Sequence, residues 1–191
     1  MNRSWKLGEF AGIGVYIHWT FAILPILIAI STFTAGEGFI SLLNGLLWIA
    51  AVFACVVLHE YGHALTARSF GIRTKDITLL PIGGVARLER IPEKPLQELA
   101  IALAGPAVNV VIAFILGVVL IVTGGIGEVL TVDFIGTSFL VNLLAVNIVL
   151  VIFNMLPAFP MDGGRVFRAI MAFWLPDLRA TEFAATVGQV I

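Results

Sequence analysis

Four hydrophobic runs divide the chain, at residues 19–34, 42–58, 99–122 and 139–155. Each run approaches the roughly 20 apolar residues that a helix needs to cross the hydrocarbon core of a bilayer. The pattern therefore predicts four transmembrane helices. A fifth apolar helix begins near Ala180, but the sequence stops at Ile191, which is too short for a span. We expect a bundle that is truncated at its C-terminal end.

Two segments alternate between apolar and polar residues instead. Residues 5–10 and 14–18, divided by Gly12, predict one β-hairpin, and residues 74–80 and 85–90, divided by residues 81–84, predict another. Open strand edges are not tolerated against lipid. Both hairpins are therefore expected at the cytoplasmic interface or inside the protein.

The positive charges are segregated along the chain. All 11 Lys and Arg residues fall before the first run, between the second and third, or after the fourth, and the loops near Glu37 and Glu128 contain none. Cytoplasmic loops are enriched in Lys and Arg. The distribution predicts a multi-pass protein of the cell membrane with a cytoplasmic N-terminus. It also places the ends of the second and fourth runs on the cytoplasmic side.

Composition excludes several classes of protein. The 191 residues are 60% hydrophobic and 12% charged, against about 45–50% and about 25% in soluble domains. This composition therefore excludes a soluble enzyme, a disordered chain and a nucleic-acid-binding protein. The formal net charge of −1 also argues against a partner that is recognised through its phosphates. The expected fold is an all-α polytopic membrane protein, one unit over residues 1–191, with small β-hairpins at the interface.

The second run ends in a metal-binding pattern, H-E-x-x-H, at His59, Glu60 and His63. Residues four apart lie on one face of a helix, so the two imidazoles can reach one ion. Zn²⁺ with two His ligands and a neighbouring carboxylate base is a hydrolytic arrangement. Ionisable groups at membrane depth are functional by default, which favours this interpretation over polar residues that merely close a helix.

A catalytic zinc needs a third protein ligand. Cys55 lies about 12 Å from His63 along a helix, too far to share the ion. His18 is interpreted as an interfacial histidine, and Glu98 as an acidic residue favoured at a helix N-terminus. Asp162 is the preferred ligand, because two prolines before it and two glycines after it predict a rigid loop with a tight turn, although an ordinary Asp-Gly turn is the alternative.

Three motifs together resemble the site-2 protease family of intramembrane zinc metalloproteases. They are His59-Glu60-x-x-His63, Ala104-Gly105-Pro106-Ala107-x-Asn109 and Asn154-x-x-Pro157-x-x-Pro160-x-Asp162-Gly163. The resemblance implies one zinc ion per chain, held by His59, His63 and Asp162, with Glu60 activating water. It also implies a transmembrane protein substrate within the lipid bilayer. Relatives carry two further spans and often regulatory CBS modules, which this sequence lacks.

Other polar residues have two interpretations. For Asn154 and Asn109 the resemblance implies an orienting or oxyanion role near the scissile carbonyl, and the alternative is hydrogen bonding between helices. A strand that includes Gly83 and Gly84 could hold an unwound substrate by β-addition. Two rival functions are a cation transporter, which would need ligands at several depths, and an inactive scaffold, against which the intact Glu60 and Asp162 argue.

Overall fold

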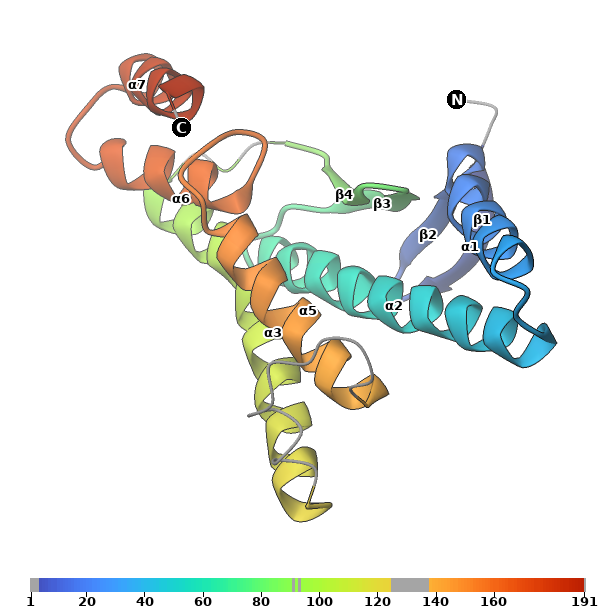
Figure 1. The fold of residues 1–191 in the computed structure, drawn as a ribbon. Helices are drawn as coiled ribbons and strands as arrows, with labels where there is room; N and C mark the ends of the chain where they lie inside the picture. Colours follow the sequence, from blue (N-terminus) through green and yellow to red (C-terminus); the bar gives the residue numbers. More distant parts are fainter. Residues whose placement is uncertain (1–3, 91, 93, 125–137, 191) are drawn as a thin grey trace.

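A computed structural model describes residues 4–90, 92, 94–124 and 138–190. It is mostly helical, with a single sheet packed on one side (Figure 1). The sequence predicted two separate hairpins, and both strand pairs form: β1 (Ser4–Phe10) with β2 (Ile13–His18), and β3 (Thr74–Leu80) with β4 (Gly83–Leu88).

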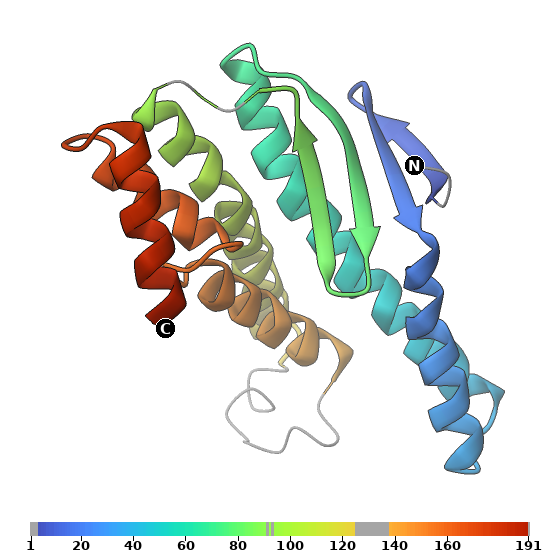
Figure 2. The same cartoon turned by 90° about the horizontal axis from the view of Figure 1, so that it is seen from above.

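The two hairpins are joined into one four-stranded sheet of order β1-β2-β3-β4, because β2 and β3 pair in parallel. The expectation that residues 81–84 form the turn of the second hairpin is wrong in part. Gly83 and Gly84 already pair with Leu80 and Leu79, so they begin β4. As the last strand of the sheet, β4 leaves one edge open, and it is the strand nearest to α3 (Figure 2).

Helices occupy all four hydrophobic runs. The first run forms the short helix η1 (Trp19–Ala22) and α1 (Ile23–Thr34), and the second forms α2 (Phe39–Ser69). The others form α3 (Pro95–Val122) and α5 (Phe139–Asn154). By length and composition α2 and α3 are able to cross a membrane, whereas the other two are shorter apolar helices. The loop near Glu128 lies outside the described residues.

The segment around Asp162 differs from the expected loop. Asp162 is the first residue of a helix, α6 (Asp162–Met171), so the tight turn predicted at its two glycines is wrong. The glycines serve close packing instead, because a Cβ on Gly163 would collide with the backbone of Met155 and Leu156 at the end of α5. The helix expected near Ala180 is α7 (Asp177–Val190).

The core lies between the sheet and α2. Side chains from β2, β3 and α2 form one buried cluster, which consists of Ile13, Val56, Ala64, Ile77 and Leu79. Many large apolar side chains on the helices remain exposed, including Phe33, Ile40, Phe114 and Val122. An exposed apolar surface of this extent is typical of a membrane or protein contact. Together with the two long apolar helices, it indicates a membrane protein.

Candidate metal centre

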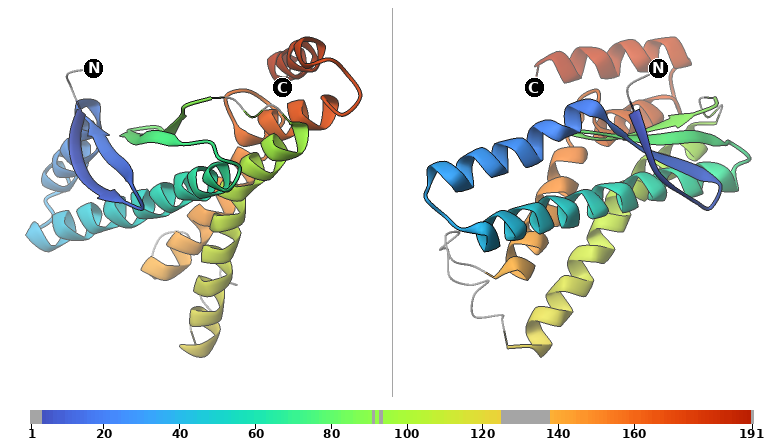
Figure 3. Two further views of the ribbon diagram at one scale, coloured as in Figure 1. Left: turned by 180° about the vertical axis from the view of Figure 1, so that it is seen from behind. Right: turned by 90° about the vertical axis from the view of Figure 1, so that its right-hand side faces the viewer.

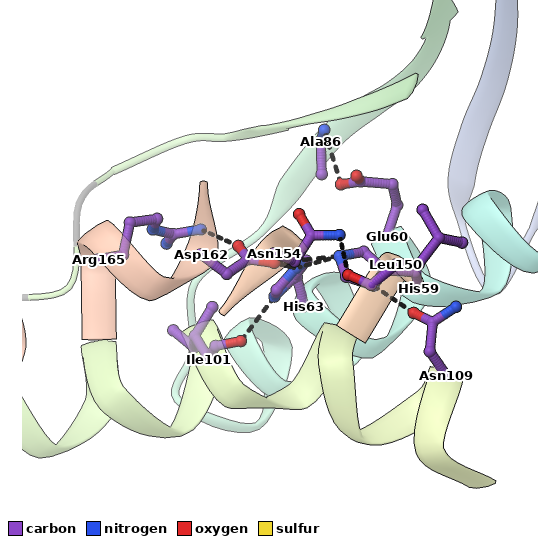
Figure 4. A network of polar contacts seen from close by, with 10 residues as sticks. All are labelled: His59, Glu60, His63, Ala86, Ile101, Asn109, Leu150, Asn154, Asp162 and Arg165. Carbon is purple, nitrogen blue, oxygen red and sulfur yellow. Dashed lines mark hydrogen bonds and ion pairs between the residues drawn. The ribbon is translucent and has the colours of Figure 1, made fainter. Parts of the chain in front are cut away.

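Three ligand atoms from two helices meet where α2, α3 and α6 converge. His59 and His63 lie one turn apart on α2, and Asp162 begins α6 (Figure 4). Asp162 Oδ2 lies 3.1 Å from each Nε2 atom, and the two Nε2 atoms are 3.1 Å apart. All three side chains are buried. The group is positioned to bind a metal ion.

Hydrogen bonds on the far side of each imidazole determine where its proton lies. His63 Nδ1 is 2.7 Å from the carbonyl oxygen of Ile101, which can only accept, so Nδ1 carries the proton. His59 Nδ1 is 2.5 Å from Asn109 Oδ1 and donates to it in the same way. Both Nε2 atoms are therefore unprotonated when the rings are neutral, and their lone pairs point toward Asp162.

A relay of two amides holds Asn109 in the required orientation. Asn147 Nδ2 donates to the carbonyl of Leu143 at 2.9 Å, which turns Asn147 Oδ1 toward Asn109 Nδ2 at 2.8 Å. Asn109 Oδ1 is thereby left facing His59. Both asparagines are fully buried. Outer hydrogen bonds of this kind fix the tautomer and the ring orientation of a ligating histidine.

The donor set fits zinc. Two neutral nitrogens and a carboxylate oxygen are all acceptors, so their convergence calls for a cation between them. Tetrahedral zinc with bonds of about 2.0–2.1 Å separates its ligand atoms by about 3.3 Å, close to the 3.1 Å found here.

Gly105 brings the α3 backbone directly against the two imidazoles. A Cβ at this position would overlap His63 Nε2 and lie 2.7 Å from His59 Nε2. We therefore expect Gly105→Ala to weaken zinc binding by more than about 100-fold, because the ligand rings must move. Gly117→Ala on the same helix is the control, since nothing lies within 4 Å of its added Cβ. Zinc titration of both variants measures the effect, and equal zinc affinities would contradict it.

The Asn109 contact gives a second prediction. Asn109→Leu keeps the branched shape of the side chain but removes the acceptor for His59 Nδ1, so we expect a 10–100-fold loss of zinc affinity. Asn44→Leu, on the exposed face of α2, is the matched control. A competition titration with a zinc chelator measures both. Unchanged affinity in the Asn109 variant would show that the relay does not position His59.

Glu60 points away from the three ligands, toward β4. The backbone N–H of Ala86 donates to Glu60 Oε2 at 3.2 Å. Gly84 provides the space, because a Cβ there would lie 2.7 Å from Glu60 Cγ. The predicted base and the predicted glycine strand are thus in direct contact. Gly83, at the start of the same strand, has a φ of 143°, a conformation that favours glycine.

Asn154 and Asn109, the two asparagines with an expected orienting or oxyanion role, lie in different parts of the site. Asn154, the last residue of α5, lies beside Asp162 (Figure 4), and its amide donates to the carbonyl of Leu150 at 2.9 Å. Asn109 lies behind His59, with its oxygen and nitrogen both engaged. Its contacts favour orienting a ligand over contacting a substrate.

The other candidate ligands lie outside the group. His18 contacts Thr20 at the start of η1, with Nδ1 2.7 Å from the hydroxyl oxygen. Cys55 Sγ accepts from Asn147 Nδ2 at 3.4 Å. The buried Glu98 accepts from Arg168 Nε at 2.8 Å, in an ion pair that ties the start of α3 to α6. Glu98 therefore supports the helix that carries Asp162, a contact between distant segments that the sequence did not predict.

The centre has the composition of a zinc metallopeptidase site: two histidines one helical turn apart, a carboxylate from another helix, and a glutamate between the histidines. Comparison with known families agrees. The model of peptidase family M50 matches residues 47–136 and 127–191. The chain belongs to this family, and its three converging ligands are positioned to hold the zinc ion that its relatives are named for.

Similar proteins extend the match across the chain. A zinc metalloprotease of Methanocaldococcus jannaschii is 37% identical over 193 residues, which cover 99% of this chain and 52% of that protein. Stage IV sporulation protein FB of Bacillus subtilis is 30% identical over 129 residues, or 65% of this chain and 40% of that protein. The chain thus spans about half the length of the curated relatives it matches.

A solved structure also matches. The site-2 protease from Methanocaldococcus jannaschii superposes with a TM-score of 0.69 at 35% identity, covering 98% of this chain and 80% of that one. The resemblance to the site-2 proteases is thereby confirmed.

Proposed function

We propose that this chain is an intramembrane endopeptidase that cuts transmembrane segments of other membrane proteins near the cytoplasmic face. The observation that carries the proposal is the place of His59 and His63. Both are buried within α2, a helix long and apolar enough to cross a membrane. Ionisable side chains at such depth cost roughly 2.5–3.5 kcal/mol each at a helix centre and are retained for function.

Four residues divide the work. His59, His63 and Asp162 would hold the zinc ion, and their buried outer contacts keep the two imidazoles in the ligating tautomer. Zinc, when bound, supplies Lewis acidity toward water and toward a carbonyl oxygen. Glu60 takes a proton from the attacking water and later delivers it to the leaving amine. Its carboxylate is held in place by the Ala86 N–H.

The substrate would bind along the open edge of β4. A helical segment hides its peptide bonds, so it must unwind before attack. An extended segment can then pair with an unpaired strand edge. Glu60 contacts Ala86 on this strand, so a segment paired there is held next to the base. Asn154, beside Asp162, would orient the scissile carbonyl or donate to its developing oxyanion.

The membrane topology belongs to the same proposal: four crossings, with the N-terminus and the active site toward the cytoplasm. Cysteine scanning tests it, because the native Cys55 is buried and should stay unlabelled. An impermeant thiol reagent added to intact cells should label Glu37→Cys and leave Lys75→Cys unlabelled until the cells are opened. Both positions are exposed. The reverse pattern would place the site on the opposite side.

A cleavage assay distinguishes the proposed peptidase from its two rivals, a cation transporter and an inactive scaffold. A transporter needs ligands at several depths, whereas in the parts of the chain that the structure describes the three-ligand cluster is confined to His59, His63 and Asp162. Purified protein mixed in detergent with a model transmembrane substrate should produce two fragments, and a zinc chelator should stop this. An inactive scaffold would bind the substrate and leave it whole. Regulation by CBS modules would require segments beyond this sequence.

A further inference from the structure

Two neighbouring cavities lie along α2, away from the metal ligands. One is an apolar groove of about 970 Å³ between α1, α2 and the sheet. The other is a polar cavity of about 580 Å³ at the cytoplasmic end proposed for α2. Ala11, in the β1–β2 turn, lines both. Figure 3 (right) shows α1 and this hairpin lying along α2.

The groove is lined almost entirely by apolar side chains. Its α2 residues run from Leu46 to Leu65, which is about 28 Å at 1.5 Å per residue. A single leaflet accounts for half of the roughly 30 Å hydrocarbon core, so the groove is long enough for an acyl chain. Phe10, Phe21 and Phe53 contribute aromatic walls.

The polar cavity has the opposite character. Arg68 and Arg73 line it, and neither guanidinium forms an ion pair with any residue that the structure describes. Thr74 lines the same cavity, and its hydroxyl is buried without a hydrogen-bond partner among residues 4–90, 92, 94–124 and 138–190. Two unpaired cations and an unused hydroxyl are the groups that bind a phosphate.

The turn between the cavities is fixed to α2. Arg68 Nη1 donates to the carbonyl of Ala11 at 3.0 Å, and the Tyr61 hydroxyl donates to the carbonyls of Phe10 at 3.1 Å and Ile13 at 3.3 Å. The first bond orients the Arg68 guanidinium, and the other two fix the turn against α2. The polar cavity is therefore preorganised next to the end of the groove.

We propose that this pair of cavities binds an anionic phospholipid. Its phosphate would lie between Arg68 and Arg73, within reach of Thr74, and an acyl chain would lie along the groove. The proposal rests on the proposed membrane location. A lipid fits both cavities at once, whereas an inorganic anion would fill only the polar cavity and an apolar helix would fill only the groove. Because Ala11 lines both cavities, one ligand with a phosphate and an acyl chain can occupy the two together.

Native mass spectrometry of the zinc-loaded full chain in detergent tests this. Dioleoyl phosphatidylglycerol should bind at least about tenfold more tightly than dioleoyl phosphatidylcholine, because only the former carries a net negative charge near the two arginines. Arg68→Gln/Arg73→Gln should abolish this preference. Lys75→Gln/Arg90→Gln, which removes the same charge from exposed positions outside the cavity, should retain it.

Two further measurements keep the test decisive. Arg73→Gln alone should lose part of the preference while keeping its zinc, which excludes misfolding as the cause. Ala54→Phe, at an exposed position of the groove, should weaken phosphatidylglycerol binding and leave binding of inorganic phosphate unchanged. Equal binding of the two lipids, an equal loss in the Lys75/Arg90 control, or indifference to Ala54→Phe would each overturn the proposal. Lipid binding is measured without a peptide substrate, so the lipid proposal can fail or succeed independently of the proposed peptidase activity.

Discussion

Replacing Glu60 by Gln is expected to leave zinc bound and to lower the peptidase rate by about 10²–10⁴-fold, the usual contribution of a general acid–base group. Glutamine keeps the shape of the side chain and an oxygen that can accept from the Ala86 N–H. It cannot take a proton from water. Because Glu60 is not one of the three converging ligands, the metal site should be preserved. Zinc content and turnover are measured on the same preparation.

Glu89→Gln is the matched control, an exposed glutamate just beyond β4 that should behave as wild type. Cleavage at the wild-type rate by the Glu60 variant would remove the general-base assignment. Loss of zinc together with activity would mean that Glu60 supports the metal site instead.

Asp162→Asn should weaken zinc binding by more than about 100-fold. A neutral amide is a poorer zinc ligand than a carboxylate, and the buried site loses a negative charge. Changes to outer-sphere partners alone typically cost 10–100-fold, so loss of a ligand should cost more. Zinc per protein at limiting metal is the measurement, and activity should fall in parallel.

Glu98→Gln is the informative comparison, because Glu98 is the other carboxylate buried next to α6. Breaking the ion pair of the buried Glu98 with the half-buried Arg168 should destabilise the protein by about 1–3 kcal/mol while leaving zinc bound at saturating metal. Thermal unfolding and zinc content separate the two roles. Full zinc retention in the Asp162 variant, with loss in the Glu98 variant, would show that Glu98 and not Asp162 is the third ligand.

The sequence predicted the helices and the converging ligands because both depend on strong local signals. Runs of apolar residues locate the four helices, although α2 continues to Ser69, well beyond the end of its run at residue 58. The four-residue spacing of His59 and His63 places both on one face wherever a helix forms. Asp162 was selected by its unusual flanking prolines and glycines, and the structure places it beside both histidines. Its catalytic role remains a prediction.

The rest depends on contacts between distant segments, which one sequence does not reveal. The conformation of Asp162 was predicted as a turn because Gly163 and Gly164 are weak helix formers. Close packing of Gly163 against Met155 and Leu156, and of Gly164 against Ala158 and Phe159, requires their small size and overrides that preference. The parallel pairing of β2 with β3 and the contact of Asn109 with His59 have no local signature. The motif that contains Asn109 indicated a functional residue, but it did not indicate that His59 is its hydrogen-bond partner.

The most direct test of an intramembrane zinc protease is to map its products. Purified, zinc-loaded protein is incubated in detergent with a model transmembrane substrate, and the fragments are identified by mass spectrometry. We predict cleavage inside the apolar segment, toward its cytoplasmic end, that stops on zinc removal, returns on zinc addition and is absent in Glu60→Gln. Cleavage confined to the soluble flanks, or cleavage that persists in the Glu60 variant, would contradict the account.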